Sequence, residues 1–304
     1  MKVLVTGGAG FIGANVVNLL ESKGAKVIVL DDFSHASYKN LEGTKSEVIC
    51  ADIIDEEIFE KLPKLDGVIH EAAITDTTLA DDTKMMKVNY NGSKNILNFC
   101  LKKKIRLVYA SSAGVYGQAQ PPMKERQKLT PHNTYGYSKY IFDCLTSEIM
   151  KKKSAPPIVG LRYFNVYGPL ESHKGLAASM IYQLYLQISA GKRPRIFKCG
   201  EQKRDFIYVK DVAAITVKAF ESRKSAILNV GTGRARSFND IIAALNKVLK
   251  KNLKPDYFDN PYEGKYQNYT EADISLLEKT LKIQAKFSLE AGIKDYVTKS
   301  LLPR

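Results

Sequence analysis

Three regularly spaced glycines near the start of the chain narrow most strongly what it can fold into. They lie in the stretch VTGGAGFIG (residues 5–13), where Gly7, Gly10 and Gly13 follow the spacing G-x-x-G-x-x-G between an apolar run and an amphipathic segment. In a strand–turn–helix segment, such glycines permit a tight turn, let the backbone approach a pyrophosphate, and let helix and strand pack closely. The free N–H groups and the dipole of the helix N-terminus then attract phosphate. We therefore predict that Gly7, Gly10, Phe11, Ile12 and Gly13 bind a dinucleotide; a purely structural glycine turn is the alternative.

Apolar runs and helical segments alternate through the first half of the chain. We predict strands at 2–7, 25–31, 46–52, 65–73, 106–112 and 157–164, and helices at 11–22, 83–103 and 135–152. Continuous apolar strands that alternate with helices are typical of a parallel sheet covered on both faces. The predicted fold is therefore α/β, a doubly wound parallel (Rossmann) sheet that binds ligands past the carboxyl ends of its strands.

The alternation loosens after residue 165, where helices predicted at about 175–190, 210–221 and 238–250 are separated by polar loops. We predict a dinucleotide-binding domain over residues 1–165, with segments of about 205–235 returning to its sheet. Residues 166–304 would then form mainly a smaller α/β domain that binds the substrate.

Two acidic residues end the second predicted strand, and the first of them follows Gly13 by 18 positions. An acidic side chain at this place accepts hydrogen bonds from the adenosine ribose and repels a 2′-phosphate. Asp31 and Asp32 are therefore predicted to bind the cofactor and favour NAD over NADP. Lys39 is close enough in sequence to leave NADP open.

A serine and a Tyr–Lys pair form the candidate catalytic set. Ser112 ends the fifth predicted strand, and Tyr135 and Lys139 lie four apart in TYGYSK (134–139), on one face of a predicted helix. A lysine beside a phenol stabilises the phenolate and lowers its pKa from about 10 toward neutrality, which suits a general base. The Ser112 hydroxyl can hand a proton between a substrate and Tyr135. We predict all three as catalytic, with Tyr135 and Lys139 also touching the cofactor; a surface Tyr–Lys pair is the alternative.

The chain of 304 residues carries a net charge of +14. Such a charge suits nucleic acid, phosphorylated small molecules or no specific partner. The lysine runs at 102–104 and 151–153 fall at the ends of predicted helices, where cations complement the helix dipole. Since the glycine turn already accounts for phosphate affinity, we predict a small-molecule substrate and no nucleic-acid partner.

The cellular setting is predicted from apolar runs and cysteines. No apolar run approaches the ~20 residues of a membrane span, and the first residues, MKVLVTG, are typical of a buried strand and not of a signal peptide. Cys50, Cys100, Cys144 and Cys199 are scattered without metal-type spacing, which is typical of reduced core thiols in a cytoplasmic protein. We predict a cytoplasmic protein without membrane contact or a metal.

Taken together, these motifs resemble the extended short-chain dehydrogenase/reductase superfamily of nucleotide-sugar epimerases and dehydratases. The segments HEAA (70–73), VNYNGSKNIL (88–97), KRDFIYVKDVA (203–213) and NVGTG (229–233) look like its landmarks. The resemblance implies a nucleotide-sugar substrate and NAD(P). It also implies further cofactor-binding residues: Asp52 and Ile53 at the adenine, Ala72 and Ala73 at the pyrophosphate and ribose, and Asn89 supporting the active site. Arg204 would contact the nucleotide phosphates of the substrate; the alternative is an ion pair with Asp205 or another local acid.

The second half of the chain is similar to the ADP-glycero-manno-heptose 6-epimerases of lipopolysaccharide core assembly, through RYFNVYGP…HKG and GKYQNYTEADISLL. That resemblance implies an isomerase in which Lys174 is a second acid/base opposite Tyr135. Asn165 would hydrogen-bond the sugar, and Tyr266 would help close the nucleotide pocket. NADP is the cofactor that the heptose epimerases imply. For Lys174, a solvent-facing loop lysine is the alternative.

Two residue pairs bear on the reaction and the substrate. Ala113 and Gly114 occupy the positions where a dehydratase of the superfamily carries an Asp-Glu pair, so dehydration is disfavoured. Leu176 and Gln183 depart from the heptose epimerase pattern, which leaves the exact sugar and nucleotide open. A nucleotide-sugar 4-epimerase of the UDP-glucose/galactose type, or a related epimerase/reductase, is the alternative function. The sequence also leaves open whether the chain forms a homo-oligomer.

Overall fold

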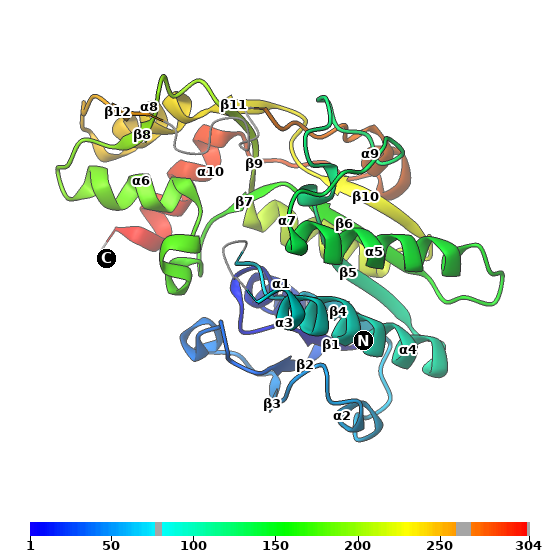
Figure 1. Cartoon of the computed structure of the whole chain (residues 1–304). Coiled ribbons are helices and arrows are strands. Elements are labelled where there is room, and N and C mark those ends of the chain that lie inside the picture. The colour runs from blue at the N-terminus through cyan, green and yellow to red at the C-terminus, as the bar shows by residue number, and fades with distance from the viewer. Residues whose placement is uncertain (77–80, 260–268, 303–304) are drawn as a thin grey trace.

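The computed structural model describes residues 1–76, 81–259 and 269–302. Its centre is a seven-stranded sheet in the order β10-β6-β5-β4-β1-β2-β3, in which all neighbouring strands pair parallel (Figure 1). Its strands are β1 (Lys2–Thr6), β2 (Lys26–Asp31), β3 (Glu47–Cys50), β4 (Gly67–His70), β5 (Arg106–Ser112), β6 (Ile158–Tyr163) and β10 (Ala226–Val230). The predicted doubly wound parallel sheet is confirmed.

Helices cover both faces of this sheet because its strands are apolar on both sides. Val3 and Val5 of β1 pack with α1 (Phe11–Ser22) and α7 (Val209–Glu221) on one face. Leu4, which points the other way, packs with α4 (Ser93–Lys103) and α5 (Thr134–Met150). This period of two is what a strand imposes on its side chains. Two short helices, α2 (Glu57–Glu60) and α9 (Ser275–Leu281), complete the surroundings of the sheet.

The helix predicted over residues 83–103 is not continuous. It consists of α3 (Asp82–Met86), a π-helical stretch at Lys87–Gly92, and α4. A Cβ on Gly92 would lie 2.6 Å from the Ile53 side chain, so glycine allows the chain to pass close to the loop after β3. Wider turns of this kind often occur at functional sites, and this one carries Asn89.

The rest of the second half packs as helices against two small sheets, at the upper left of Figure 1. The small sheets are formed by β7 (Asn165–Tyr167), β9 (Lys203–Tyr208) and β11 (Ala235–Ser237), and by β8 (Arg195–Phe197) with β12 (Asp256–Phe258). The helices α6 (Met180–Ser189), α8 (Phe238–Leu249) and α10 (Leu289–Tyr296) share one apolar core with them. Segments expected to be polar loops thus contain strands, most of them only three residues long.

The helix predicted from residue 175 begins later. Residues Ser172–Ala177 form a 3₁₀ turn in which Gly175 has φ +55°, and α6 starts only at Met180. Ser179 caps it, since its side chain accepts a hydrogen bond from the backbone N–H of Tyr182.

The expectation that the four cysteines are core thiols was wrong for three of them. All four are free thiols, but Cys50, Cys144 and Cys199 are exposed and only Cys100 is buried.

Candidate active site

A cavity of about 830 Å³ opens past the carboxyl ends of β1, β2, β4, β5 and β6 and extends to the loop before α6. It brings together residues that are up to 231 positions apart, from Gly7 to Phe238. The sequence-predicted site residues that line it are Gly7, Gly10, Phe11, Ile12, Gly13, Asp31, Asp32, Asp52, Ile53, Ala72, Ala73, Ser112, Tyr135, Lys139, Asn165, Lys174 and Arg204.

The glycine turn between β1 and α1 is packed so closely that side chains are excluded. A Cβ on Gly7, where φ is +67°, would lie 2.5 Å from the Ala72 nitrogen, and one on Gly13 would lie 2.1 Å from the Gly7 carbonyl oxygen. Gly10 is the N-cap of α1, and its residue type offers no side chain to cap the first N–H groups. No acidic residue lies in that first turn. These free donors at the positive end of the helix dipole fit the pyrophosphate of a dinucleotide.

Asp31 holds the glycine turn in place. One carboxylate oxygen accepts a hydrogen bond from the backbone N–H of Ala9 at 2.9 Å, and the other accepts one from that of Phe33 at 2.9 Å. Burial raises the pKa of Asp31. Asp32 is exposed and caps its own turn, since it accepts hydrogen bonds from the backbone and hydroxyl of Ser34.

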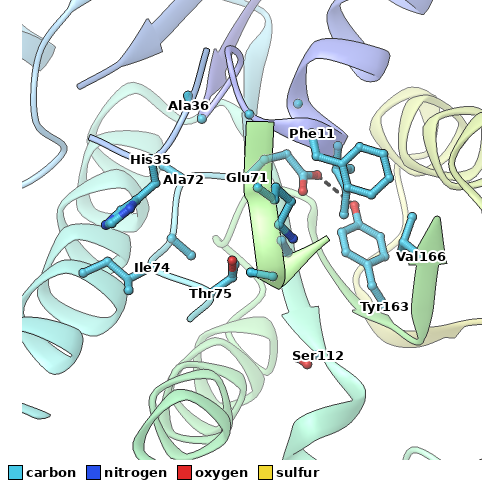
Figure 2. Close-up of a pocket in the computed structure, with 18 of the residues that line it drawn as sticks. Phe11, His35, Ala36, Glu71, Ala72, Ile74, Thr75, Ser112, Tyr163 and Val166 are labelled. Carbon is cyan, nitrogen blue, oxygen red and sulfur yellow. Dashed lines mark hydrogen bonds between the residues drawn. The ribbon is translucent and has the colours of Figure 1, made fainter. Parts of the chain in front are cut away.

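Sequence reasoning missed Ser34, His35 and Ala36, which follow these two aspartates and also line the cavity (Figure 2). Their types carry no pattern that could have singled them out. Their position directly after the acidic end of β2 is the only signal.

The predicted catalytic set comes together at the N-terminus of α5. Lys139 donates a hydrogen bond to the carbonyl oxygen of Ala110 at 2.9 Å, and its Nζ lies 6.0 Å from the centre of the Tyr135 ring. Ser112 bonds the Tyr135 side chain and accepts a hydrogen bond from the Gly114 backbone N–H at 3.0 Å. The arrangement places a hydroxyl, a phenol and an amine along one wall of the cavity.

The pKa of Tyr135 is raised above its ordinary value, whereas the sequence predicted that it would be lowered. Burial raises it, the hydrogen bond from Ser112 lowers it, and the negative charge of Glu71 raises it again. Lys139 gives its hydrogen bond to Ala110 and not to the phenol. Burial in turn lowers the pKa of Lys139 to about 8. The expected depression of the Tyr135 pKa by Lys139 is therefore wrong.

Asn89 does not line the cavity but braces one of its walls. Its carboxamide accepts a hydrogen bond from the Ile74 N–H at 2.8 Å and donates one to the Ile74 carbonyl at 2.9 Å. Ile74 and Thr75 line the cavity directly. Asn89 thus supports the loop after β4 from behind.

Arg204 lies in β9 and is 7% exposed. Its predicted alternative partner, Asp205, directs its carboxylate elsewhere, to the backbone N–H groups of Thr232 (2.7 Å), Gly233 (2.9 Å) and Ala272 (3.1 Å). The other predicted substrate residue, Tyr266, lies outside the described residues.

The loop that carries Lys174 is held by a buried carboxylate that sequence reasoning missed. Glu171, 1% exposed, accepts hydrogen bonds from the backbone N–H groups of Gly168 (3.0 Å) and Ser179 (2.6 Å) and from the Ser179 hydroxyl (3.0 Å). Lys174 Nζ lies 5.8 Å from the centre of the Phe11 ring, beside the glycine turn. Burial lowers the pKa of Lys174. Lys174 therefore faces the cavity from the side of the glycine turn.

The two departures from the heptose epimerase pattern also lie at this loop. Gln183 donates a hydrogen bond to the Gly175 carbonyl at 2.7 Å and so ties the turn to α6. Leu176 is 96% exposed and does not line the cavity. The loop also contacts the first half of the chain, because Asn40 bonds both the Ala9 carbonyl (2.9 Å) and the ring of His173 (3.2 Å).

Comparison with known proteins places this arrangement in a family. The model of the NAD dependent epimerase/dehydratase family matches residues 3–231. The chain belongs to this family. The predicted superfamily and the predicted enzyme class are confirmed.

Individual relatives agree with that assignment. The chain is 42% identical over 309 aligned residues to ADP-L-glycero-D-manno-heptose-6-epimerase of Brachyspira hyodysenteriae, which covers 97% of this chain and 96% of the relative. The crystal structure of the Helicobacter pylori enzyme of the same name superposes with a TM-score of 0.91 at 41% identity, over 98% of this chain and 95% of that one. UDP-glucose 4-epimerase of Thermotoga maritima, in a structure with UDP-glucose, superposes with a TM-score of 0.90 at 30% identity, over 98% of both chains. The predicted resemblance to the heptose 6-epimerases is confirmed.

Two features are absent from the residues that the structure describes. No helix in this part of the chain is long and apolar enough to cross a membrane. Within the same residues, no group of three or more His, Cys, Asp or Glu side chains is arranged to hold a metal ion.

Proposed function

We propose that the protein inverts C6 of ADP-glycero-manno-heptose through a transient ketone, with NAD(P)⁺ bound in the cavity. One observation carries the proposal: Tyr135 from α5 and Lys174 from the loop before α6 reach the same cavity as the glycine turn. The 42% identity to the Brachyspira enzyme supports the heptose as the substrate.

Inversion through a ketone requires acid/base groups in two places. The dinucleotide supplies a carbon that accepts and returns a hydride. When the sugar turns its other face toward that carbon, its oxygen meets a different proton donor. Tyr135, assisted by Ser112, serves one orientation, and Lys174 serves the other. Burial lowers the pKa of Lys174, which makes its ammonium a better proton donor.

The remaining predicted residues bind and orient. Asn165 holds the sugar, and the guanidinium of Arg204 holds the nucleotide phosphates, which it can contact in a bidentate manner. Tyr266, which lies outside the described residues, keeps its predicted role at the nucleotide. We assign residues 1–165 and the returning segments of about 205–235 to cofactor binding, and residues 166–304 mainly to the nucleotide sugar.

NAD is the proposed cofactor in preference to NADP. Asp31 and Asp32 both line the cavity after β2, where two carboxylates repel a 2′-phosphate. The heptose epimerase resemblance favours NADP instead. Measuring the affinities of the protein for NAD and for NADP distinguishes the two. A cytoplasmic location and assembly into a homo-oligomer stay predictions.

The decisive test offers ADP-D-glycero-D-manno-heptose and UDP-glucose to the purified protein and follows the configuration at C6 and C4 by NMR. We expect inversion at C6 of the heptose. The second candidate, a nucleotide-sugar 4-epimerase, is favoured by the superposition on the Thermotoga enzyme, and inversion at C4 alone would replace the first proposal by the second. Lys174→Met should abolish 6-epimerisation, whereas an unchanged rate would remove the second acid/base group from the mechanism.

A further inference from the structure

Glu71 lines the cavity, but the mechanism above assigns it no role. It directly follows the last residue of β4, and its backbone N–H donates a hydrogen bond to the Thr6 carbonyl at the end of β1. Its side chain extends toward Phe11 and Tyr163 (Figure 2). The strand order places β4 between β1, which carries the glycine turn, and β5, which carries Ser112. Glu71 therefore lies between the predicted pyrophosphate site and the catalytic set.

The hydrogen bonds of Glu71 suit both of its charge states. Oε1 is 2.8 Å from the Tyr163 hydroxyl, which is also 2.8 Å from the Thr216 hydroxyl. When Glu71 is ionised, the Tyr163 hydroxyl donates its proton to the carboxylate. When Glu71 is neutral, the same hydroxyl accepts the carboxyl proton and donates its own to the Thr216 hydroxyl. The second oxygen, Oε2, has no hydrogen-bond partner among the residues that the structure describes. The carboxyl can thus change its charge without breaking the network.

The groups around Glu71 leave its charge sensitive to a nearby cation. From α5 it faces the ammonium of Lys139 and the phenol of Tyr135; from β6 it faces Tyr163. Its neighbour His70 is bonded to Thr6 and Ser93, and burial lowers the His70 pKa to about 3, so that ring is neutral. Burial raises the pKa of Glu71 to about 7. A positive charge that enters the cavity beside it would favour the carboxylate.

We propose that Glu71 contacts the nicotinamide end of the bound dinucleotide, where its carboxylate stabilises the oxidised, cationic ring over the reduced, neutral ring. The inference rests on the proposed function. In this fold a dinucleotide crosses the carboxyl ends of the strands from the glycine turn, and its reactive end must meet the substrate at Tyr135. A hydride, one proton with two electrons, passes from the sugar carbon to the ring while the hydroxyl proton passes to Tyr135. The ring thereby loses its positive charge, and the return step restores it.

This arrangement gives an epimerase two advantages. The resting protein holds the dinucleotide in the oxidised form that begins each turnover. During turnover, a carboxylate beside the reduced ring makes return of the hydride to the ketone more favourable, because that step regenerates the cation that the carboxylate attracts. The intermediate is therefore reduced before it can leave.

The test is a redox titration of the dinucleotide bound to the wild type and to Glu71→Gln, which reports the ratio of affinities for the oxidised and reduced forms. We expect the wild type to favour the oxidised form about tenfold more than the variant does, a shift of about 30 mV for two electrons. Glu125→Gln is the matched control: burial also raises the pKa of Glu125, but that side chain lies outside the cavity, so the ratio should stay as in the wild type.

Other results would refute either this inference or the proposed function. If Glu71→Gln weakened both forms equally, Glu71 would be merely structural and the inference would fail. A wild type that bound no dinucleotide would instead refute the proposed function. Should the variant not fold, the wild type alone suffices: its preference for the oxidised form should weaken several-fold between about pH 7 and pH 5 as the carboxylate takes up a proton. A preference that stays constant over that range overturns the inference.

Discussion

Replacing Lys139 by methionine should stabilise the cofactor-free protein while it abolishes catalysis. Lys139 is 4% exposed, and burial lowers its pKa from 10.5 to about 8. The shift corresponds to about 3 kcal/mol by which folding disfavours the ammonium at neutral pH. This cost already includes the attraction of the ammonium by Glu71 and Asp143. Loss of Lys139 also leaves the buried Glu71 carboxylate, whose pKa is already raised to about 7, without a cation that favours it, and this offsets part of the gain.

Methionine removes the buried charge but also the hydrogen bond to Ala110, which contributes about 1 kcal/mol. We therefore expect Lys139→Met to raise the free energy of unfolding by about 1–2 kcal/mol at pH 7, and Tm by about 2–3 °C. Urea unfolding of the protein freed of dinucleotide measures the change. Lys151→Met, in the exposed lysine that follows the same helix, is the control and should leave the free energy of unfolding nearly unchanged.

The pH dependence gives a second check on the same reasoning. Because the folded-state pKa of Lys139 is lower than its unfolded value, the unfolded chain binds more protons between about pH 8 and pH 10.5, and the wild type gains stability as the pH rises through that window. The variant lacks this gain, so its advantage should shrink toward pH 10. A variant less stable than the wild type at pH 7 would refute the argument from buried charge.

Three further predictions concern the glycine turn, the phenol and the Lys174 loop. Tyr135→Phe should lower turnover by at least about 10³-fold yet leave dinucleotide affinity within about twofold by titration; a wild-type rate would remove Tyr135 as the base. Gly13→Ala should abolish dinucleotide binding in the same titration, because the new Cβ would lie 2.1 Å from the Gly7 carbonyl oxygen, and binding at wild-type affinity would contradict that packing. Gln183→Ala should lower turnover about tenfold by freeing the Gly175 turn, whereas Leu176→Ala, at a 96% exposed position outside the cavity, should leave turnover unchanged; equal turnover in the two variants would refute this role of Gln183.

The parts of the site that could be predicted from the sequence are those encoded locally. The glycine turn is defined within nine residues, and Tyr135 and Lys139 share a helix face by their spacing alone. Six of the seven strands of the large sheet were predicted, because they are largely apolar runs, whereas β10 was expected only within the segments of about 205–235 that return to the sheet. In contrast, strands of three residues such as β7, β8 and β11 are too short to show a period of two.

The residues that the sequence could not reveal act through distant partners. Glu71 accepts a hydrogen bond from Tyr163, which lies 92 positions further along the chain, and no pattern near either residue predicts this contact. Glu171 gains its role only because the chain folds back to bring Ser179 onto it. The pKa of Tyr135 was misjudged for a related reason: the neighbouring lysine is visible in the sequence, but the burial that outweighs it is not.

The two hydrogen bonds of Asp31 bear on any attempt to change the cofactor preference of this enzyme. Removing the acidic residue after the second strand is the obvious way to admit a 2′-phosphate. Here the Asp31 carboxylate also accepts the hydrogen bond of the Ala9 N–H, and so helps to fix the shape of the turn at which we propose that the pyrophosphate binds. Its removal would therefore weaken both dinucleotides together. Asp32, in contrast, accepts hydrogen bonds from Ser34 in its own exposed turn. It is therefore the position at which the preference between NAD and NADP can be altered without weakening the binding of the part that both dinucleotides share.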